Sequence, residues 1–462
     1  MTRVPETRSA DGPAAPGWGG ERRQNHLYQP FLRGALVTVL TVGCSLGALN
    51  LLVMGFGANL DAVWTPLIQA HGYSQIFGWV GLFLMGMAYH TLTRYWLRPL
   101  RHPSWVAPSF ALVVASLVLR VLTQPFAALP IAGAGLVLSG VLGLAGYGLF
   151  AWAMFDTMRH GADSTAPGGY VPFMVAGFGW LVVAAALTLA ITTALALRGI
   201  ATIPAAWDAP YLRVALSGAI VTLILGYTLR TVPFMLGLRP GAPRAFRQAF
   251  TTYTAGVLVQ VAAAVVLSGQ ATLLLGLIGA VAELAGLAWF VGLLGLFARS
   301  ARARPPRREK NPWPARFIRS AYGWLLAAAA LNVVYAAVAG SGGAVPHAFV
   351  AAYHHALTVG FISFMIVGMS MRLVPVFLGD MLRRPGWAAL IFAGLFTGNS
   401  LRVLTEPLAA RYGGVFYAVM GLSGVIEVAG LACYGVLLWR ALGRPSYGAS
   451  RPAPAASIVT AR

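Results

Sequence analysis

The sequence contains few charged residues and few cysteines, and each shortage restricts the class of protein. Only 10% of the 462 residues are charged, whereas 58% are hydrophobic. A soluble protein of this length needs far more charge to cover its surface. The two cysteines, Cys44 and Cys433, lie inside apolar runs, and no CxxC, zinc-finger or CxxCH sequence occurs. These shortages argue against a disulfide framework, a thiolate metal cluster and covalently attached haem.

Long apolar runs are what the sequence has instead. Runs of about 20 residues or more recur along the whole chain, which is typical of transmembrane helices. They are continuous and do not alternate with polar residues, which argues against a β-barrel. The sequence therefore predicts an all-α integral membrane protein. The twelve expected spans are 34–57, 67–92, 105–125, 131–155, 170–196, 210–236, 248–268, 271–297, 317–340, 347–377, 386–406 and 413–440.

The basic residues fall between the apolar runs, and arginine-rich connections alternate with connections that carry few arginines. The chain has one lysine, Lys310, and a net charge of +21. Such a charge can indicate nucleic-acid binding, but this placement is typical of a protein oriented in a lipid bilayer. We therefore expect no nucleic-acid partner, and a bacterial inner-membrane protein with both termini in the cytosol. Residues 1–33 and 441–462 are expected to be disordered cytosolic tails, not a signal peptide.

Two segments of the chain return at one fixed offset. RHPSW at 101–105 is followed by RRPGW at 383–387, and LRVLTQP at 119–125 by LRVLTEP at 401–407. The step from 101 to 383 equals the step from 119 to 401, so both pairs are in the same register. Two such matches indicate an internal repeat, in which the spans near the amino end resemble those near the carboxyl end.

A weaker copy lies between them, at about half that offset. GYTLRTVPFMLG at 226–237 matches GMSMRLVPVFLG at 368–379. ELAGLAWF at 283–290 matches EVAGLACY at 427–434 in nearly the same register. We therefore expect a single membrane domain built from three units of four helices. The domain covers 34–440, with units at about 34–160, 168–300 and 315–440.

Histidines suited to a haem iron stand on spans 2 and 10. His71 lies at the outer start of span 2, and His347, His354 and His355 lie at the outer start of span 10. The repeat places them at nearly one depth, and two imidazoles on facing helices are what axial ligation of haem requires. Neighbours on a helix point about 100° apart, so only one of His354 and His355 can address a given ring. The alternative is that these are interfacial polar residues bonded to the backbone.

Arginines and glutamates inside the spans form two further candidate sets. Arg120 and Arg402 occupy matching positions near the outer ends of spans 3 and 11, where the middle unit has Gln260. A buried arginine needs an anionic partner, which haem propionates would supply, or a route by which it snorkels to the interface. Glu283 and Glu427 are equivalent residues near mid-helix. They are candidates for proton transfer or for structural hydrogen bonds between helices.

The twelve spans in three four-helix units resemble subunit I of the haem–copper oxidases, in which haem ligands come from spans 2 and 10. HALTVGFISFMIVGMSMR at 355–372 resembles the span-10 motif of the NnrS family of membrane haem proteins, and LRVL at 119–122 and 401–404 resembles its arginine element. This resemblance implies haem b, copper, and a role in nitric oxide metabolism or nitrosative stress. The haem would fall to His71 and to His355 or His354.

One departure from the oxidases is clear. Those enzymes hold a second metal with histidines on spans 6 and 7, but residues 161–346 contain no histidine. We therefore do not expect a conventional binuclear site, and copper has no candidate ligands beyond His347 and His354. Two other functions stay open, a membrane transporter without haem and a quinol-linked oxidase or nitric oxide reductase-like oxidoreductase. Whether the protein is an enzyme is left open.

Overall fold

The computed structural model describes residues 27–56, 63–96, 98–160, 169–298, 311–343, 345–378 and 385–443. The regular structure within these ranges is helical throughout. It contains twelve helical spans that are long and apolar enough to cross a membrane, which confirms the predicted number. Most of the two predicted tails, 1–26 and 444–462, lies outside the described residues.

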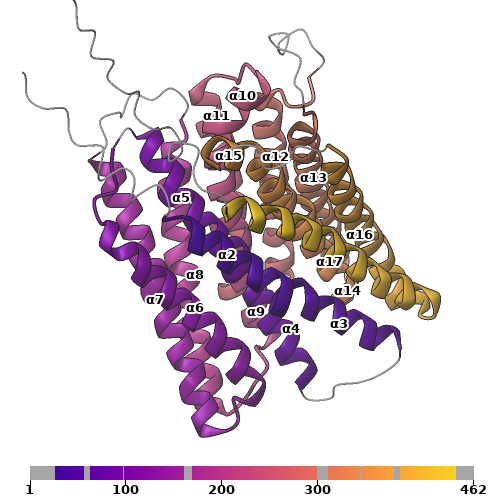
Figure 1. Ribbon diagram of the computed structural model, residues 1–462. Coiled ribbons are helices and arrows are strands. Elements are labelled where there is room, and N and C mark those ends of the chain that lie inside the picture. Colours follow the sequence, from indigo (N-terminus) through magenta and orange to yellow (C-terminus); the bar gives the residue numbers. More distant parts are fainter. Residues whose placement is uncertain are drawn as a thin grey trace, which may run out of the picture.

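The spans follow one another along the chain with short connections (Figure 1). Spans 1 to 4 comprise α2 (Gln29–Thr38), η1 (Val39–Gly43) and α3 (Cys44–Gly55); α4 (Trp64–Tyr73), η3 (Ser74–Val80) and α5 (Gly81–Tyr95); η4 (Pro103–Trp105), α6 (Val106–Thr123) and η5 (Gln124–Phe126); and α7 (Pro130–Arg159). Spans 5 to 8 comprise α8 (Val171–Arg198); α9 (Ala205–Arg213), η6 (Val214–Val221) and α10 (Thr222–Leu236); α11 (Pro243–Val266); and α12 (Gly269–Leu294). Spans 9 to 12 comprise α13 (Trp313–Gly340); α14 (His347–His355), η8 (Ala356–Ser363) and α15 (Phe364–Leu378); α16 (Pro385–Tyr412); and α17 (Val415–Leu442).

Most edges differ from the sequence prediction by a few residues, and two of these differences illustrate the reasons. Span 1 begins at Gln29, ahead of the predicted start at 34. Span 11 continues through Pro407 to Tyr412, whereas the prediction ended it at 406. A proline removes one backbone hydrogen bond, but within a membrane bundle neighbouring helices can compensate for that loss. Glu406 therefore lies in the interior of a helix and not at its end.

Spans 2, 6 and 10 form the inside of the bundle. The apolar windows of these three spans are 94%, 83% and 78% buried, whereas the windows of the other nine are at most 44% buried. Each predicted unit thus contributes one inner span and three outer ones. Spans 12 and 1 pack against each other through α17, α2 and α3, so the first and last units are neighbours (Figure 1). Arg33 also donates a hydrogen bond of 3.1 Å to the carbonyl of Leu442.

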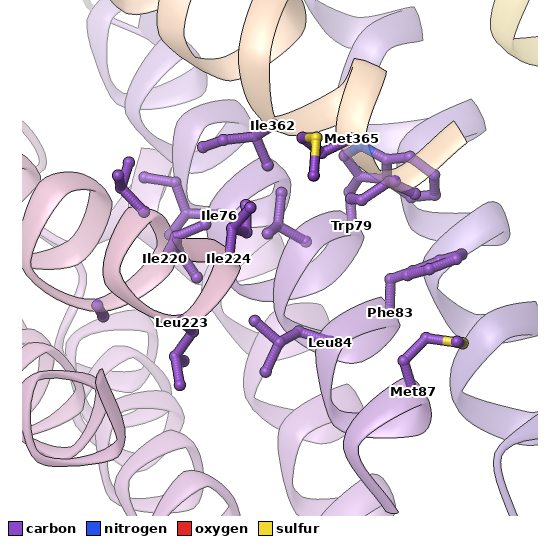
Figure 2. Packing of buried hydrophobic residues seen from close by; sticks show 14 of the residues in the cluster. Ile76, Trp79, Phe83, Leu84, Met87, Ile220, Leu223, Ile224, Ile362 and Met365 are labelled. Carbon is purple, nitrogen blue, oxygen red and sulfur yellow. The ribbon is translucent and has the colours of Figure 1, made fainter. Parts of the chain in front are cut away.

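The three inner spans meet through apolar side chains. Trp79 and Leu84 of span 2, Ile220 of span 6, and Ile362 and Met365 of span 10 lie near one another at the centre of the bundle (Figure 2). All five side chains are buried. The centre of the bundle is therefore packed with apolar side chains. The buried polar side chains lie between the inner spans and the outer ones.

Each inner span contains a π-helical segment at the equivalent place. These segments are η3, η6 and η8, and they begin directly after Tyr73, Arg213 and His355. A π-helical turn inserts an extra residue, which changes the direction of the following side chains, and it occurs frequently at functional sites. The three residues that precede the segments are therefore equivalent in structure as well as in sequence.

Candidate functional site

Buried polar side chains form three clusters, one beside each inner span, and their members occupy equivalent positions of the repeat. The first cluster consists of Tyr73, Ser116, Arg120 and Gln124. The middle cluster consists of Arg213, Gln260, Glu283 and Asn332. The third cluster consists of His71, His355, Arg402, Glu406 and Glu427. We add the buried Asn50, because it is the repeat equivalent of Asn332 in the middle cluster. The clusters differ in how far their polar atoms satisfy one another.

The middle cluster is a closed network of hydrogen bonds. Arg213 donates from Nη1 to Glu283 Oε2 and from Nη2 to Asn332 Oδ1, both at 3.1 Å. Gln260 Nε2 donates to Glu283 Oε2 at 2.8 Å, and Asn332 Nδ2 donates to Gln260 Oε1 at 3.0 Å. Ser217 Oγ donates to the other carboxylate oxygen of Glu283 at 2.9 Å. Glu283, one of the two carboxylates singled out from the sequence, thus stands in a complete structural ion pair.

Little space is left beside this network. A cavity of about 10 Å³ lies next to Glu283, Tyr353 and Leu357. A cavity of that size holds about one water molecule. The middle cluster therefore leaves room for no more than a water molecule at that cavity.

In the third cluster, His71 packs against span 1. Its Nδ1 lies 2.9 Å from the carbonyl oxygen of Gly43. A side chain at position 47 is excluded, because a Cβ on Gly47 would lie 2.7 Å from His71 Cε1. A carbonyl oxygen can only accept, so Nδ1 carries the ring proton and Nε2 keeps its lone pair. That tautomer is the one in which Nε2 can bind a metal.

His355 is held in the same way, and it lies near His71. Its Nδ1 lies 3.0 Å from the carbonyl oxygen of Ala351, one turn earlier in α14. His355 lies close enough to His71 and Arg402 for electrostatic interaction. His354 instead interacts with Arg213 of the middle cluster and with His347. The structure therefore brings His71 and His355 together, and it turns His354 toward the other unit.

The remaining side chains of the third cluster leave polar atoms without partners. Arg402 Nη2 donates to Glu406 Oε1 at 2.8 Å, and Glu406 Oε2 lies 3.9 Å from His355 Nδ1, which is too far for a hydrogen bond. Buried atoms without a hydrogen-bond partner are Asn50 Oδ1, Arg402 Nε and Nη1, Glu406 Oε2 and Glu427 Oε1. Each such atom costs about 1–3 kcal/mol. Several buried polar atoms without hydrogen-bond partners are expected at a site where a polar ligand supplies the missing partners.

The first cluster has a tyrosine where the third has a histidine. Tyr73 stands at the position of His355, and its hydroxyl lies 3.0 Å from Ser116 Oγ. The Arg120 guanidinium lies over the Tyr73 ring at 5.1 Å. A Cβ on Gly143, which stands where the other units have Glu283 and Glu427, would lie 2.9 Å from Ser116 Oγ. Arg120, predicted to act beside Arg402, therefore lies in a different cluster.

Sequence reasoning missed Asn50, Asn332 and Arg213 as members of the polar clusters. Asn50 and Asn332 are each the last residue of an ALN tripeptide. The two tripeptides are separated by the same number of residues as LRVLTQP and LRVLTEP. That signal could have identified them. Among the residues that the structure describes, no three His, Cys, Asp or Glu side chains are close enough to hold a metal ion. Copper at His347 and His354 stays a prediction.

Comparison with known proteins identifies the fold. No protein-family model matches the chain, and no curated protein sequence matches it. The solved structures that match include a cryo-EM structure of a heme-copper terminal oxidase dimer, with a TM-score of 0.67 and 12% sequence identity. The match covers 94% of this chain and 88% of the oxidase chain. It confirms the predicted all-α membrane fold, which resembles subunit I of the haem–copper oxidases. At 12% identity the likeness shows the fold alone.

Proposed function

We propose that this protein is a membrane-bound b-type haem protein of the NnrS-like kind, with the haem held between His71 and His355. The observation that carries the proposal is the proximity of these two imidazoles. Each has Nδ1 near a backbone carbonyl oxygen, which favours the tautomer whose Nε2 lone pair can bind a metal. The oxidase-like fold supports it, because spans 2 and 10 are both inner spans of that fold.

The residues of the third cluster fit the edges of a haem. Arg402 has two buried donors, Nε and Nη1, without a partner. A haem propionate is a carboxylate that can accept from both, and Glu406 fixes the guanidinium through its third nitrogen. Bound haem would supply reversible one-electron chemistry at its iron. His71 and His355 would hold the haem, and its one-electron chemistry suits electron transfer.

Nitric oxide enters the proposal through the resemblance of 355–372 and the LRVL segments to the NnrS family. We propose a role in nitric oxide response or nitrosative stress tolerance on that basis. His71 and His355 are the residues that would hold the haem at which nitric oxide would act. A bacterial inner-membrane location with both termini in the cytosol belongs to the same proposal, and so does copper as a second cofactor.

A reduced-minus-oxidised absorption spectrum of the purified protein tests the proposal. We expect the bands of a b-type haem, with about one haem per chain. His71→Ala and His355→Ala should each abolish or shift the bands, and His354→Ala should leave them unchanged. A protein without haem bands would favour the transporter alternative, and bands that persist in both alanine variants would show that the ligands lie elsewhere. Metal analysis of the same sample tests for copper.

A further inference from the structure

Arg120 is a buried cation to which the described residues offer no acceptor for Nε or Nη1. Its side chain is 1% exposed, and its Nε and Nη1 have no hydrogen-bond partner. Within the part of the chain that the structure describes, no ion pair to Arg120 is found either. Burying an unpaired guanidinium costs several kcal/mol, and the Tyr73 ring at 5.1 Å returns only about 2 kcal/mol. The first cluster therefore lacks an anion.

The equivalent arginine shows what is missing. Arg402 and Arg120 occupy the same position of LRVLTEP and LRVLTQP. One helical turn later the third unit has Glu406, which pairs with Arg402 at 2.8 Å. The first unit has Gln124 at that position, and it carries no charge. Gln124 Nε2 instead lies 3.3 Å from Gln69 Oε1 and from the carbonyl of Ala201. The replacement of glutamate by glutamine removes the internal counterion.

The next unit does not supply the missing charge. Asp208 of α9 is close enough to Arg120 for electrostatic interaction, but no ion pair within 4.0 Å joins them in the described residues, and Asp208 is partly exposed. Tyr211 is also near, and its hydroxyl lies 3.0 Å from Thr188 Oγ1. Both neighbours leave Nε and Nη1 of Arg120 without acceptors.

We propose that the first cluster is a binding site for an oxyanion, with Arg120 as its recognition residue. Nε and Nη1 of a guanidinium present two donors in the geometry that two oxygens on one atom accept, as in a carboxylate, nitrite or phosphate. The ligand takes the place of the carboxylate that Glu406 provides in the third unit. The burial of Arg120 favours a small free anion over a lipid phosphate, which stays at the bilayer surface. This site does not depend on haem binding.

Anion-dependent stability tests the inference. The full-length protein in nanodiscs of zwitterionic lipid is titrated with sodium formate, with sodium chloride at equal ionic strength as reference, and the melting temperature is followed. We expect a saturable rise with formate. Arg120→Gln, the residue that the middle unit has at this position, should weaken the apparent affinity at least about tenfold. Arg411→Gln, which removes an exposed arginine, should not change it.

Gln124→Glu is the decisive variant. It restores the internal carboxylate found in the third unit, so it should remove the response to formate and raise the melting temperature in anion-free buffer. Nanodiscs with anionic lipid and no formate show whether the bound oxyanion is a free anion or a lipid headgroup phosphate. A response to that lipid alone assigns the oxyanion to a headgroup phosphate. The inference is overturned if neither formate nor anionic lipid stabilises the protein, or if a response persists in both Arg120→Gln and Gln124→Glu.

Discussion

The middle and third clusters hold similar polar residues at equivalent positions. The polar atoms of the middle cluster satisfy one another with hydrogen bonds, whereas several of those in the third cluster have no partner. Each has an asparagine from an outer span and a glutamate near mid-helix. In the middle cluster Arg213 reaches both Glu283 and Asn332. In the third cluster the shorter His355 stands at the position of Arg213, and Asn50 and Glu427 keep atoms without partners. One side chain at the start of the π-helical segment thus decides whether a cluster satisfies itself or requires a ligand.

Replacing His355 by arginine should have the largest effect on haem binding. His355→Arg places in the third cluster the residue that closes the middle one. We expect the arginine to pair with Glu427 and Asn50, so the protein should stay folded and lose its haem. The haem content of purified protein, with a melting curve on the same sample, measures both. Retention of a full haem complement would show that His355 is not a ligand.

The next largest effect should be a difference in stability between variants of Glu283 and Glu427. Glu283→Ala leaves Arg213 as an unpaired buried charge, which should lower the free energy of unfolding by about 3–5 kcal/mol. Glu427→Ala removes a side chain whose Oε1 has no partner, so the loss should be about 1 kcal/mol. Unfolding by SDS in mixed micelles compares the two variants. Equal losses would contradict the assignment of a structural ion pair to Glu283 alone.

A smaller effect is expected where span 1 meets His71. Gly47→Val would place side-chain atoms in the space of the His71 ring, since even a Cβ would lie 2.7 Å from Cε1. We expect haem occupancy to fall several-fold. Gly72→Ala is the matched control, because a Cβ there meets no atom within 4 Å. Haem content per chain measures both, and a normal occupancy in Gly47→Val would place the haem away from this ring.

The smallest effect on the haem should come from a change at the edge of the middle cluster. Ser217→Ala removes the hydrogen bond of 2.9 Å to Glu283 Oε1. A hydrogen bond to a charged group contributes about 1.5–3 kcal/mol, so the free energy of unfolding should fall by that amount while the haem spectrum stays unchanged. A change in the spectrum would mean that the middle and third clusters are not independent.

The spans and the repeat could be predicted from the sequence because both depend on local composition and on exact spacing. Long apolar runs predicted twelve spans, and the constant offset between repeated segments related Arg120 to Arg402. The orientation of individual side chains could not be predicted in this way. Whether His354 or His355 faces His71 depends on helix packing, and the π-helical segments that follow have no sequence signature.

Two other residues were missed for physical reasons. Glu406 stands at the predicted end of span 11, and Pro407 follows it in the sequence. A proline usually ends a helix. The tertiary structure carries α16 past that proline to Tyr412, which brings Glu406 beside Arg402. Arg213 near the start of span 6 was not singled out from the sequence, but it forms an ion pair with Glu283. In both cases packing between helices overrides a local signal.

Electron paramagnetic resonance of the oxidised protein tests the pairing of His71 and His355 most directly. Two axial imidazoles give a low-spin ferric haem. We predict a low-spin signal in the wild type and in His354→Ala, and a high-spin signal or loss of haem in His71→Ala and in His355→Ala. A wild-type protein whose ferric haem is high-spin, or a low-spin signal that survives in His355→Ala, would contradict the proposed site.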